Sequence, residues 1–186
     1  GYVDIVSSCH GIVGNDDVKF TGGTYSITSQ GHAIKANDSV RINGGSFSLT
    51  SKKDGIHVNN SDSLGYFYIN GGNIVVNASG DGLSANEYIY IENGNLNLTS
   101  GGGNNASLTS ESTKGIVCPS DIVIEGGTII IDSCSDSIHS NTSVWIKGGT
   151  INLSSGDDGI HADTSIIIDD GDIDIKKAYE GIEAQN

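Results

Sequence analysis

The sequence predicts an all-β protein, a parallel β-helix or solenoid of about eight stacked coils. A unit reading roughly D-G-I-H-A-N-x-S-V-x-I-x-G-G-x-I-x-L-x-S recurs along the chain. Within each unit, apolar and polar residues alternate over three short runs, which is the pattern of half-buried strands. Strands this short cannot bury an apolar face alone, so successive units must stack and share one core.

The first isoleucine (or leucine) of each unit marks the period. Successive units are 22 residues apart, except for two steps that are longer by 5 and by 11 residues. We interpret the excess residues as protruding loops, near Ser61–Gly65 and at Gly101–Glu111. We therefore expect one domain over residues 1–186, part of a longer chain. The marker positions are Ile12, Ile34, Ile56, Leu83, Ile116, Ile138, Ile160 and Ile182.

The three runs of one unit are predicted strands. In the seventh unit their inward residues are Ile160/Ala162, Ile166/Ile168 and Ile173/Ile175. Gly-Gly, Asn-Gly or Asp-Gly separates the second run from the third and supplies a residue with positive φ. We expect a right-handed solenoid, because parallel crossover connections have that hand. Cys118 falls in a column of small inward residues, so we interpret it as a core residue.

The amino-acid composition argues against several classes of binding partner. The apolar fraction of 35% is low for a globule but sufficient for a narrow, regular core. The net charge of −14, from 23 acids and 9 bases, argues against nucleic acid and anionic membranes as partners. No apolar run approaches the length of a membrane-spanning helix, so no membrane insertion is expected. Three irregularly spaced cysteines indicate neither a disulfide framework nor a metal knuckle.

Stacking places equivalent residues of successive units above one another. The column before the corner glycine, which we call the acid column, is rich in carboxylates. Like charges at strand spacing repel, so these carboxylates either extend into water or bind cations between coils. Calcium, which prefers several carboxylate and carbonyl oxygens, is the favoured ion. The acid column is His10, His32, Asp54, Asp81, Lys114, Asp136, Asp158 and Glu180, and the predicted calcium ligands are Asp54, Asp81, Asp136, Asp157, Asp158 and Glu180.

Three other features of the sequence bear on this site. His139 and His161 are predicted neighbours, for which a solvated polar face is favoured over a zinc or sugar contact.

Lys114 is expected to form an ion pair with the neighbouring acids, and it is also the base that a lyase would use. A column of asparagines at the next corner, including Asn15, Asn37 and Asn59, is expected to form an amide ladder.

Outward residues of the second run form a predicted aromatic stripe. Four tyrosines fall on two adjacent coils, and the single tryptophan lies two coils further along. Exposed aromatic surface on a flat sheet suits the apolar faces of sugar rings. Basic residues extend the stripe and could meet uronic carboxylates. The alternative is that an insertion folds over the rings. The predicted ligand-binding residues are Tyr66, Tyr68, Tyr88, Tyr90, Trp145, Lys19 and Arg41.

The segments KKDGIHVNN, GDGLSANEYIYIENG and GDDGIHADTSIIIDDG resemble a family of secreted bacterial carbohydrate-binding proteins. The repeat extends the resemblance over nearly the whole chain. It implies the right-handed parallel β-helix of the pectate-lyase-like superfamily, bound calcium, and affinity for cellulose and acidic plant polysaccharides. A related lyase would place a basic residue beside the calcium, where Lys53 and Lys114 are the candidates. By position, the resemblance assigns calcium to Asp136, Asp157 and Asp158, and also to Asp54 and Asp81.

We therefore expect a calcium-stabilised polysaccharide-binding module, secreted or at the cell surface, with no catalytic residue. Its ligand is expected to be cellulose or an acidic plant polysaccharide such as polygalacturonate. Two alternatives remain. One is a calcium-dependent, pectate-type lyase in which Lys114 removes a proton made acidic by the metal. The other is a structural stalk or adhesin, in which the columns only stabilise the solenoid.

Overall fold

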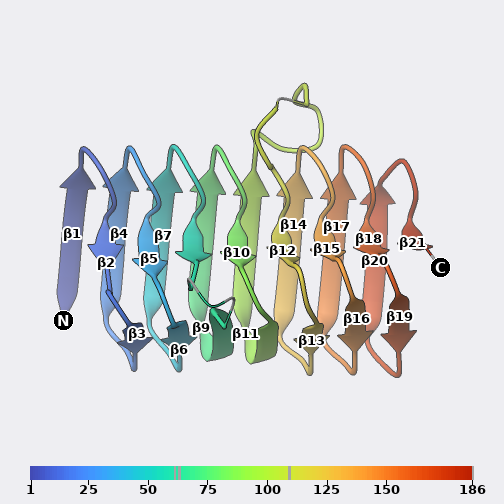
Figure 1. Cartoon of the computed structure of the whole chain (residues 1–186), viewed down its shortest axis with the longest axis horizontal. Coiled ribbons are helices and arrows are strands. Elements are labelled where there is room, and N and C mark those ends of the chain that lie inside the picture. The colour runs from blue at the N-terminus through green and yellow to red at the C-terminus, as the bar shows by residue number, and fades with distance from the viewer. Residues whose placement is uncertain (61, 63, 109, 186) are drawn as a thin grey trace.

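A computed structural model describes residues 1–60, 62, 64–108 and 110–185. Parallel strands stack as a β-solenoid of about eight coils with roughly 22-residue spacing, and the described residues contain no helix (Figure 1). The predicted fold class is therefore confirmed. The coils follow one another along the long axis, from the N-terminus at one end to the C-terminus at the other.

The first run of each unit forms a short strand, and these strands make an eight-stranded parallel sheet. Each strand pairs in register with its equivalent in the next coil, so that Ile116 lies between Leu83 and Ile138. The strands are β2 (Ile12–Val13), β5 (Ile34–Ala36), β8 (Ile56–Val58), β10 (Leu83–Ala85), β12 (Ile116–Cys118), β15 (Ile138–Ser140), β18 (Ile160–Ala162) and β21 (Ile182–Ala184).

The second and third runs form a thirteen-stranded parallel sheet. In two coils the runs merge into one long strand, β9 (Tyr66–Ala78) and β11 (Ile89–Ser100). The other second-run strands are β3 (Asp17–Phe20), β6 (Ser39–Ile42), β13 (Ile122–Ile124), β16 (Ser143–Ile146) and β19 (Ser165–Ile168). The other third-run strands are β1 (Tyr2–Ser7), β4 (Thr24–Ser29), β7 (Ser46–Ser51), β14 (Thr128–Ser133), β17 (Thr150–Ser155) and β20 (Asp172–Lys177).

Glycines turn the chain between the second and third runs, as the sequence predicted. The second residue of each predicted pair has positive φ, a conformation that only glycine adopts without strain. These residues are Gly23, Gly45, Gly72, Gly94, Gly127, Gly149 and Gly171, with φ from 92° to 131°.

The core is a single column of apolar side chains, mostly aliphatic with phenylalanines in the N-terminal coils, that runs along the solenoid. Inward residues of all three runs are buried in the middle coils, including Ile91, Ile124 and Leu153. Cys118 is 1% exposed, and burial raises the pKa of its thiol to about 12. The prediction that Cys118 is a small core residue is confirmed.

The two insertions protrude between regular strands. The shorter one lies between β8 and β9, where Ser61 and Ser63 are outside the described residues. The longer one stands out between β11 and β12 (Figure 1). Its Asn104 receives hydrogen bonds from the Lys177 ammonium and donates one to Asp132 (N to Oδ1, 2.7 Å), so it contacts β14 and β20. The rings of Tyr88 and Trp145 remain 38% exposed.

Candidate functional site

The acid column forms a ladder of side chain-to-backbone hydrogen bonds along the solenoid. A side-chain atom in one coil accepts the backbone N–H of the column residue in the next coil, where the corner would otherwise leave that donor unpaired. The acceptor and donor pairs are His10 Nδ1 and His32 (3.0 Å), His32 Nδ1 and Asp54 (3.2 Å), Asp54 Oδ1 and Asp81 (2.9 Å), Asp81 Oδ1 and Lys114 (2.7 Å), Asp136 Oδ1 and Asp158 (3.2 Å), and Asp158 Oδ1 and Glu180 (3.3 Å).

Lys114 interrupts this ladder, because an ammonium group has no acceptor atom. Its Nζ instead lies 3.9 Å from Asp136 Oδ2, and both side chains are largely buried. The predicted ion pair is therefore present with Asp136. The backbone N–H of Lys114 donates to Asp81, so Lys114 also joins the two halves of the column.

Asp54 and Asp81 sit on adjacent coils and have opposite pKa shifts. Burial and the charge of Asp54 raise the pKa of Asp81 to about 6, although the Ser112 hydroxyl and the Lys114 N–H favour its ionised form. Burial opposes ionisation of Asp54 too, but the imidazoles of His32 and His57 hold its pKa well below the usual range. Asp54, whose carboxylate remains ionised, thus lies next to Asp81, whose carboxyl group is protonated in mild acid.

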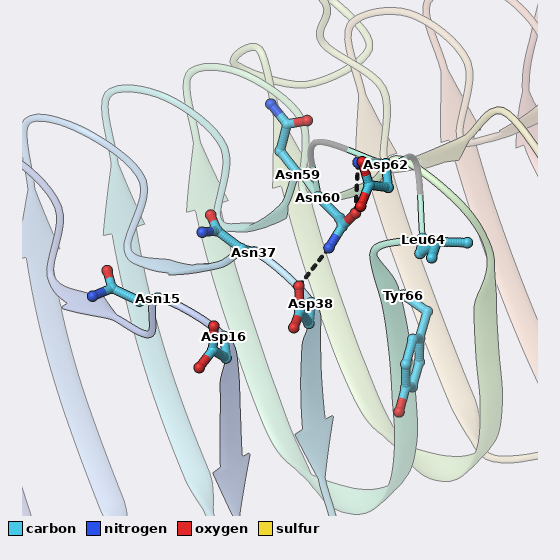
Figure 2. Close-up of a pocket in the computed structure, with 9 residues that line it drawn as sticks. All are labelled: Asn15, Asp16, Asn37, Asp38, Asn59, Asn60, Asp62, Leu64 and Tyr66. Carbon is cyan, nitrogen blue, oxygen red and sulfur yellow. Dashed lines mark hydrogen bonds between the residues drawn. The ribbon is translucent and has the colours of Figure 1, made fainter.

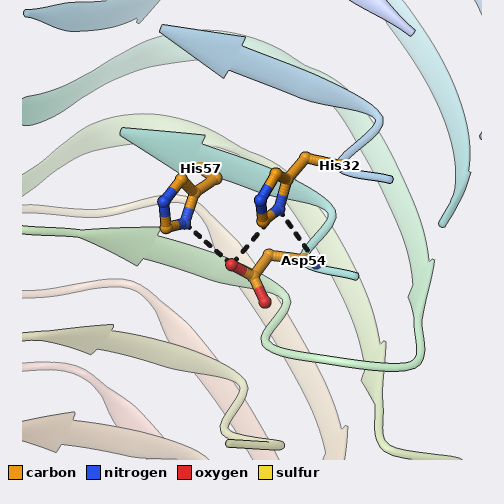
Figure 3. Close-up of side chains that lie close together, drawn as sticks. All are labelled: His32, Asp54 and His57. Carbon is orange, nitrogen blue, oxygen red and sulfur yellow. Dashed lines mark hydrogen bonds and ion pairs between the residues drawn. The ribbon is translucent and has the colours of Figure 1, made fainter. Parts of the chain in front are cut away.

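Histidines flank the column in a repeated Asp-x-x-His arrangement (Figure 3). His57 Nδ1 lies 2.8 Å from Asp54 Oδ2, and His32 Nδ1 lies 3.3 Å from the same oxygen. The rings of His32 and His57 stack with centroids 4.2 Å apart. The same contact recurs between His139 Nδ1 and Asp136 Oδ2, at 2.7 Å. Asp54, Asp136 and Asp158 therefore each accept a backbone N–H at Oδ1 and contact an imidazole at Oδ2.

His161 is buried, at 7% exposed, which makes the expectation of a solvated polar face wrong for this residue. Its Nδ1 lies 3.2 Å from Asp158 Oδ2 and 2.8 Å from Glu183 Oε2, and its Nε2 lies 3.2 Å from Asp163 Oδ1. Burial lowers the pKa of His161, but Asp158 and Asp163 outweigh it, so the net shift is upward. His161 takes part in two clusters of potential metal ligands, one with Asp158 and Glu183 and one with His139 and Asp163, and within each cluster the ligand atoms lie within 4.8 Å of one another.

Three predicted calcium ligands come together at the corner before β18. Asp136, Asp157 and Asp158 each offer a carboxylate oxygen, and these atoms all lie within 4.8 Å of one another. Asp136 and Asp158 are buried, whereas Asp157 is half-buried. Several convergent carboxylate oxygens are the donor set that calcium prefers, so the residues fit this ion.

The other predicted ligands are placed differently. Among the described residues, Asp54 converges with His32 and His57, a mixed nitrogen and oxygen set. Asp81 accepts hydrogen bonds from Ser112 and Lys114. Glu180 is exposed and contacts Asp158 through its backbone N–H.

The aromatic stripe points outward from the second-run face, as predicted, but its rings do not lie flat on the sheet. Tyr66 and Tyr88 stack with centroids 4.9 Å apart and planes 5° apart, and Tyr68 stacks with Tyr90 at 5.8 Å. In-register strands place equivalent residues at about the distance of ring stacking, so identical rings pair face to face. The stripe is therefore made of ring pairs that stack on each other between successive coils.

Acidic residues hold the polar tips of the stripe. The hydroxyl of Tyr68 donates to Glu92, and that of Tyr90 donates to Glu125 Oε1 at 2.7 Å. The indole N–H of Trp145 donates to Asp169 Oδ2 at 2.7 Å. These bonds orient the rings and give the surface between them a negative character.

The predicted basic residues contribute less free charge than the sequence suggested. Arg41 Nη2 lies 3.3 Å from Asp17 Oδ2, so its charge is partly balanced. Lys19 is exposed on β3. Sequence reasoning missed Lys147, whose Nζ lies 4.0 Å above the Trp145 ring and 2.7 Å from Glu125 Oε1.

Three hollows surround these groups. The first, about 860 Å³, is lined by Asn15, Asp16, Asn37, Asp38, Asn59, Asn60, Asp62, Leu64 and Tyr66 (Figure 2). The second, about 570 Å³, is lined by His32, Lys52, Lys53, Asp54, His57, Ser79, Gly80, Asp81, Ser84, Glu111 and Ser112. The third, about 330 Å³, is lined by Tyr68, Tyr88, Tyr90 and Glu92.

The expected amide ladder is present between Asn59 and Asn86, and its N-terminal members line the first hollow. Asn86 Nδ2 donates to Asn59 Oδ1 at 3.2 Å, which is the predicted kind of contact. Asn15 and Asn37 are instead exposed along the wall of the hollow.

These features define an all-β solenoid repeat protein with polar hollows and outward aromatic side chains. The chain belongs to the family described as carbohydrate-binding domain-containing protein, whose model matches residues 1–159. No curated protein and no solved structure matches it. The described residues include no helix long and apolar enough to cross a membrane.

Proposed function

We propose that the chain is a calcium-stabilised polysaccharide-binding module that works outside the cell, with cellulose or polygalacturonate as the reference ligands. The observation that carries the binding role is the cluster of outward tyrosines beside two hollows on one lateral face. Aromatic rings with fixed polar tips, next to carboxylates and amides, offer a sugar both apolar contact and hydrogen-bond acceptors. The family supports the same role.

Asp136, Asp157 and Asp158 would hold the calcium ion. Asp136 and Asp158 belong to neighbouring coils, whose strands β15 and β18 are paired. An ion between them would offset the repulsion of like charges and link the two coils. Extracellular modules bind calcium with dissociation constants of about 0.1–1 mM, so saturation outside the cell is compatible with a site of this kind.

The binding role is tested with a variant that carries Tyr68→Ala, Tyr90→Ala and Trp145→Ala. Loss of three aromatic contacts should weaken glycan binding by at least about tenfold in a pull-down on cellulose and polygalacturonate. Tyr179→Ala, at a tyrosine exposed outside the stripe, is the matched control and should bind normally. Unchanged binding by the triple variant would favour the structural stalk over the binding module.

A pectate-type lyase is the second candidate, because Lys53 lines the same hollow as Asp54 and Asp81. A lysine beside carboxylates that could hold calcium is what abstraction of an acidic α-proton requires. Lys114, in contrast, is held by Asp136. Ultraviolet absorbance of unsaturated uronide, measured on polygalacturonate with calcium, decides the matter. Its appearance in the wild type and its loss in Lys53→Ala would establish the lyase.

A further inference from the structure

The stacking of the tyrosines leaves one aromatic face open toward the N-terminal coils. Tyr88 covers one side of the Tyr66 ring. On the other side, the residue paired with Tyr66 is Ser39, a small side chain that is buried and hydrogen-bonded to Asp17. Tyr66 therefore forms the end wall of the 860 Å³ hollow, with Asp38 on the neighbouring coil (Figure 2).

The walls of this hollow, which we call the Asn/Asp groove, repeat along the solenoid. Asn15 and Asp16 are followed one coil later by Asn37 and Asp38, at the coil spacing of about 4.8 Å. Figure 2 shows the two pairs side by side, with Tyr66 at the end of the row. Such a row offers evenly spaced acceptors along one wall of the groove.

The charged side chains that line the groove are all acidic. Carboxylates come from Asp16, Asp38 and Asp62, and none of the described lining residues is basic. Asn60 donates to Asp38 and accepts the backbone N–H of Asp62 at 2.7 Å, which orients these groups. Hydroxyl and ammonium groups would therefore find acceptors here, whereas a ligand carboxylate would meet like charge without a compensating cation.

We propose that the Asn/Asp groove is the subsite that selects the glycan. It takes a chain rich in hydrogen-bond donors and free of carboxylates, with one sugar ring stacked on the open face of Tyr66. In this groove and without calcium, chains with protonated amino groups, of the polyglucosamine type, bind most tightly, neutral β-glucans less so, and polyuronates least. This inference rests on the proposed polysaccharide-binding function and assigns its ligand class.

The test is calorimetric titration with three oligosaccharides of equal length, derived from polyglucosamine, cellulose and polygalacturonate. It is run below neutral pH, at low salt and with EGTA, so that no calcium ion bridges carboxylates. We expect affinity to fall in that order. The polyglucosamine preference should shrink as salt is added, because exposed charges are screened.

Four variants locate the subsite. Tyr66→Ala should weaken the polyglucosamine and cellulose ligands by about tenfold, whereas Tyr66→Phe keeps the ring face and should bind nearly as the wild type does. Asp16→Asn should weaken polyglucosamine more than the cellulose ligand. Asp174→Asn, at an exposed carboxylate on β20, is its matched control and should change neither.

Two results would overturn the proposal while leaving the proposed function intact. One is oligogalacturonate binding as tightly as polyglucosamine in EGTA. The other is normal binding by Tyr66→Ala together with loss of binding in the Tyr68, Tyr90 and Trp145 triple variant. If a wild-type chain with an unchanged melting curve binds none of the three ligands, both the subsite and the proposed function are wrong.

Discussion

At the scale of single residues, aspartate and histidine are interchangeable in the acid column because both carry an acceptor at the δ position. His32 Nδ1 accepts the backbone N–H of Asp54, and Asp54 Oδ1 accepts the equivalent N–H of Asp81 in the following coil. Lysine cannot replace them, and the ladder is interrupted at Lys114. The column therefore has a structural role first, and among the described residues the Asp136, Asp157 and Asp158 corner is the one group of potential metal ligands made of carboxylates alone.

Asp81 should make stability depend on pH. Its pKa is about 6 in the folded protein, above the ordinary aspartate value of about 4 in the unfolded chain. The folded state therefore holds a proton that the unfolded state has lost, so the free energy of unfolding falls as pH rises from about 4 to 6. We expect Asp81→Asn, measured by denaturation in EGTA, to be more stable than the wild type at pH 7 by about 1–3 kcal/mol.

The advantage of Asp81→Asn should disappear below pH 4, where the wild-type carboxyl is protonated in both states. Asp174→Asn, at an exposed aspartate, serves as the comparison and should show no such window. Equal stability of the two variants across the pH range would show that Asp81 is not held in a costly ionised state.

Thiol accessibility should separate the three cysteines. Cys9 is exposed, whereas Cys118 and Cys134 are buried. Because burial also raises the pKa of Cys118 to about 12, its reactive thiolate is scarce in the folded protein. A thiol reagent should label Cys9 alone in the native chain and all three after denaturation. Rapid native labelling of Cys118 would contradict its place in the core.

At the scale of elements, the turn between the second and third strands of each coil depends on its second glycine. Gly45 has φ of 115°, and a Cβ there would lie 3.1 Å from both Gly23 O and Phe47 Cε2. Gly44, its neighbour, has no positive φ and only an ordinary contact at 3.4 Å. Two adjacent glycines in one turn thus have different physical roles.

We expect Gly45→Ala to lower the free energy of unfolding by about 1–3 kcal/mol, because alanine is strained at positive φ. Gly44→Ala should change it by no more than about 0.5 kcal/mol. Urea denaturation of both variants provides the measurement. A similar loss in the two would mean that the backbone conformation of Gly45 does not limit this turn.

At the scale of the whole molecule, stability comes from coils that stack on each other through parallel ladders and one continuous core. Each coil contacts mainly its neighbours, so a cation between two coils adds to the stability of the stack. The corner of Asp136, Asp157 and Asp158 is the place where such an addition is expected.

Calcium should therefore raise the melting temperature of the chain. An ion that binds only the folded state adds about 2.7 kcal/mol at a concentration of 100 times its dissociation constant. Thermal melts with calcium and with EGTA give the shift, and Asp157→Asn should reduce it. An identical melting temperature in calcium and EGTA would remove the calcium proposal without touching the glycan-binding role.

The solenoid, its period, its turns and the inward columns can be predicted from the sequence, since they follow from local alternation and from a repeat of fixed length. It also placed Asp136, Asp157 and Asp158 together, because a constant 22-residue step translates directly into vertical neighbours. Cys118 in the core and the outward direction of Tyr68 and Trp145 could be predicted for the same reason.

The contacts that the side chains make within those columns could not be predicted, because they depend on the three-dimensional packing of the coils. Rotamers and distances between coils turn Tyr66 and Tyr88 into a stacked pair, bury His161 among carboxylates, and open the Asn/Asp groove along the N-terminal members of the amide ladder. The repeat period determines which residues are neighbours in successive coils. Side-chain torsions, burial and the course of the irregular insertion determine which contacts those neighbours make. The candidate site depends on these side-chain contacts, whereas the fold depends on the repeat alone.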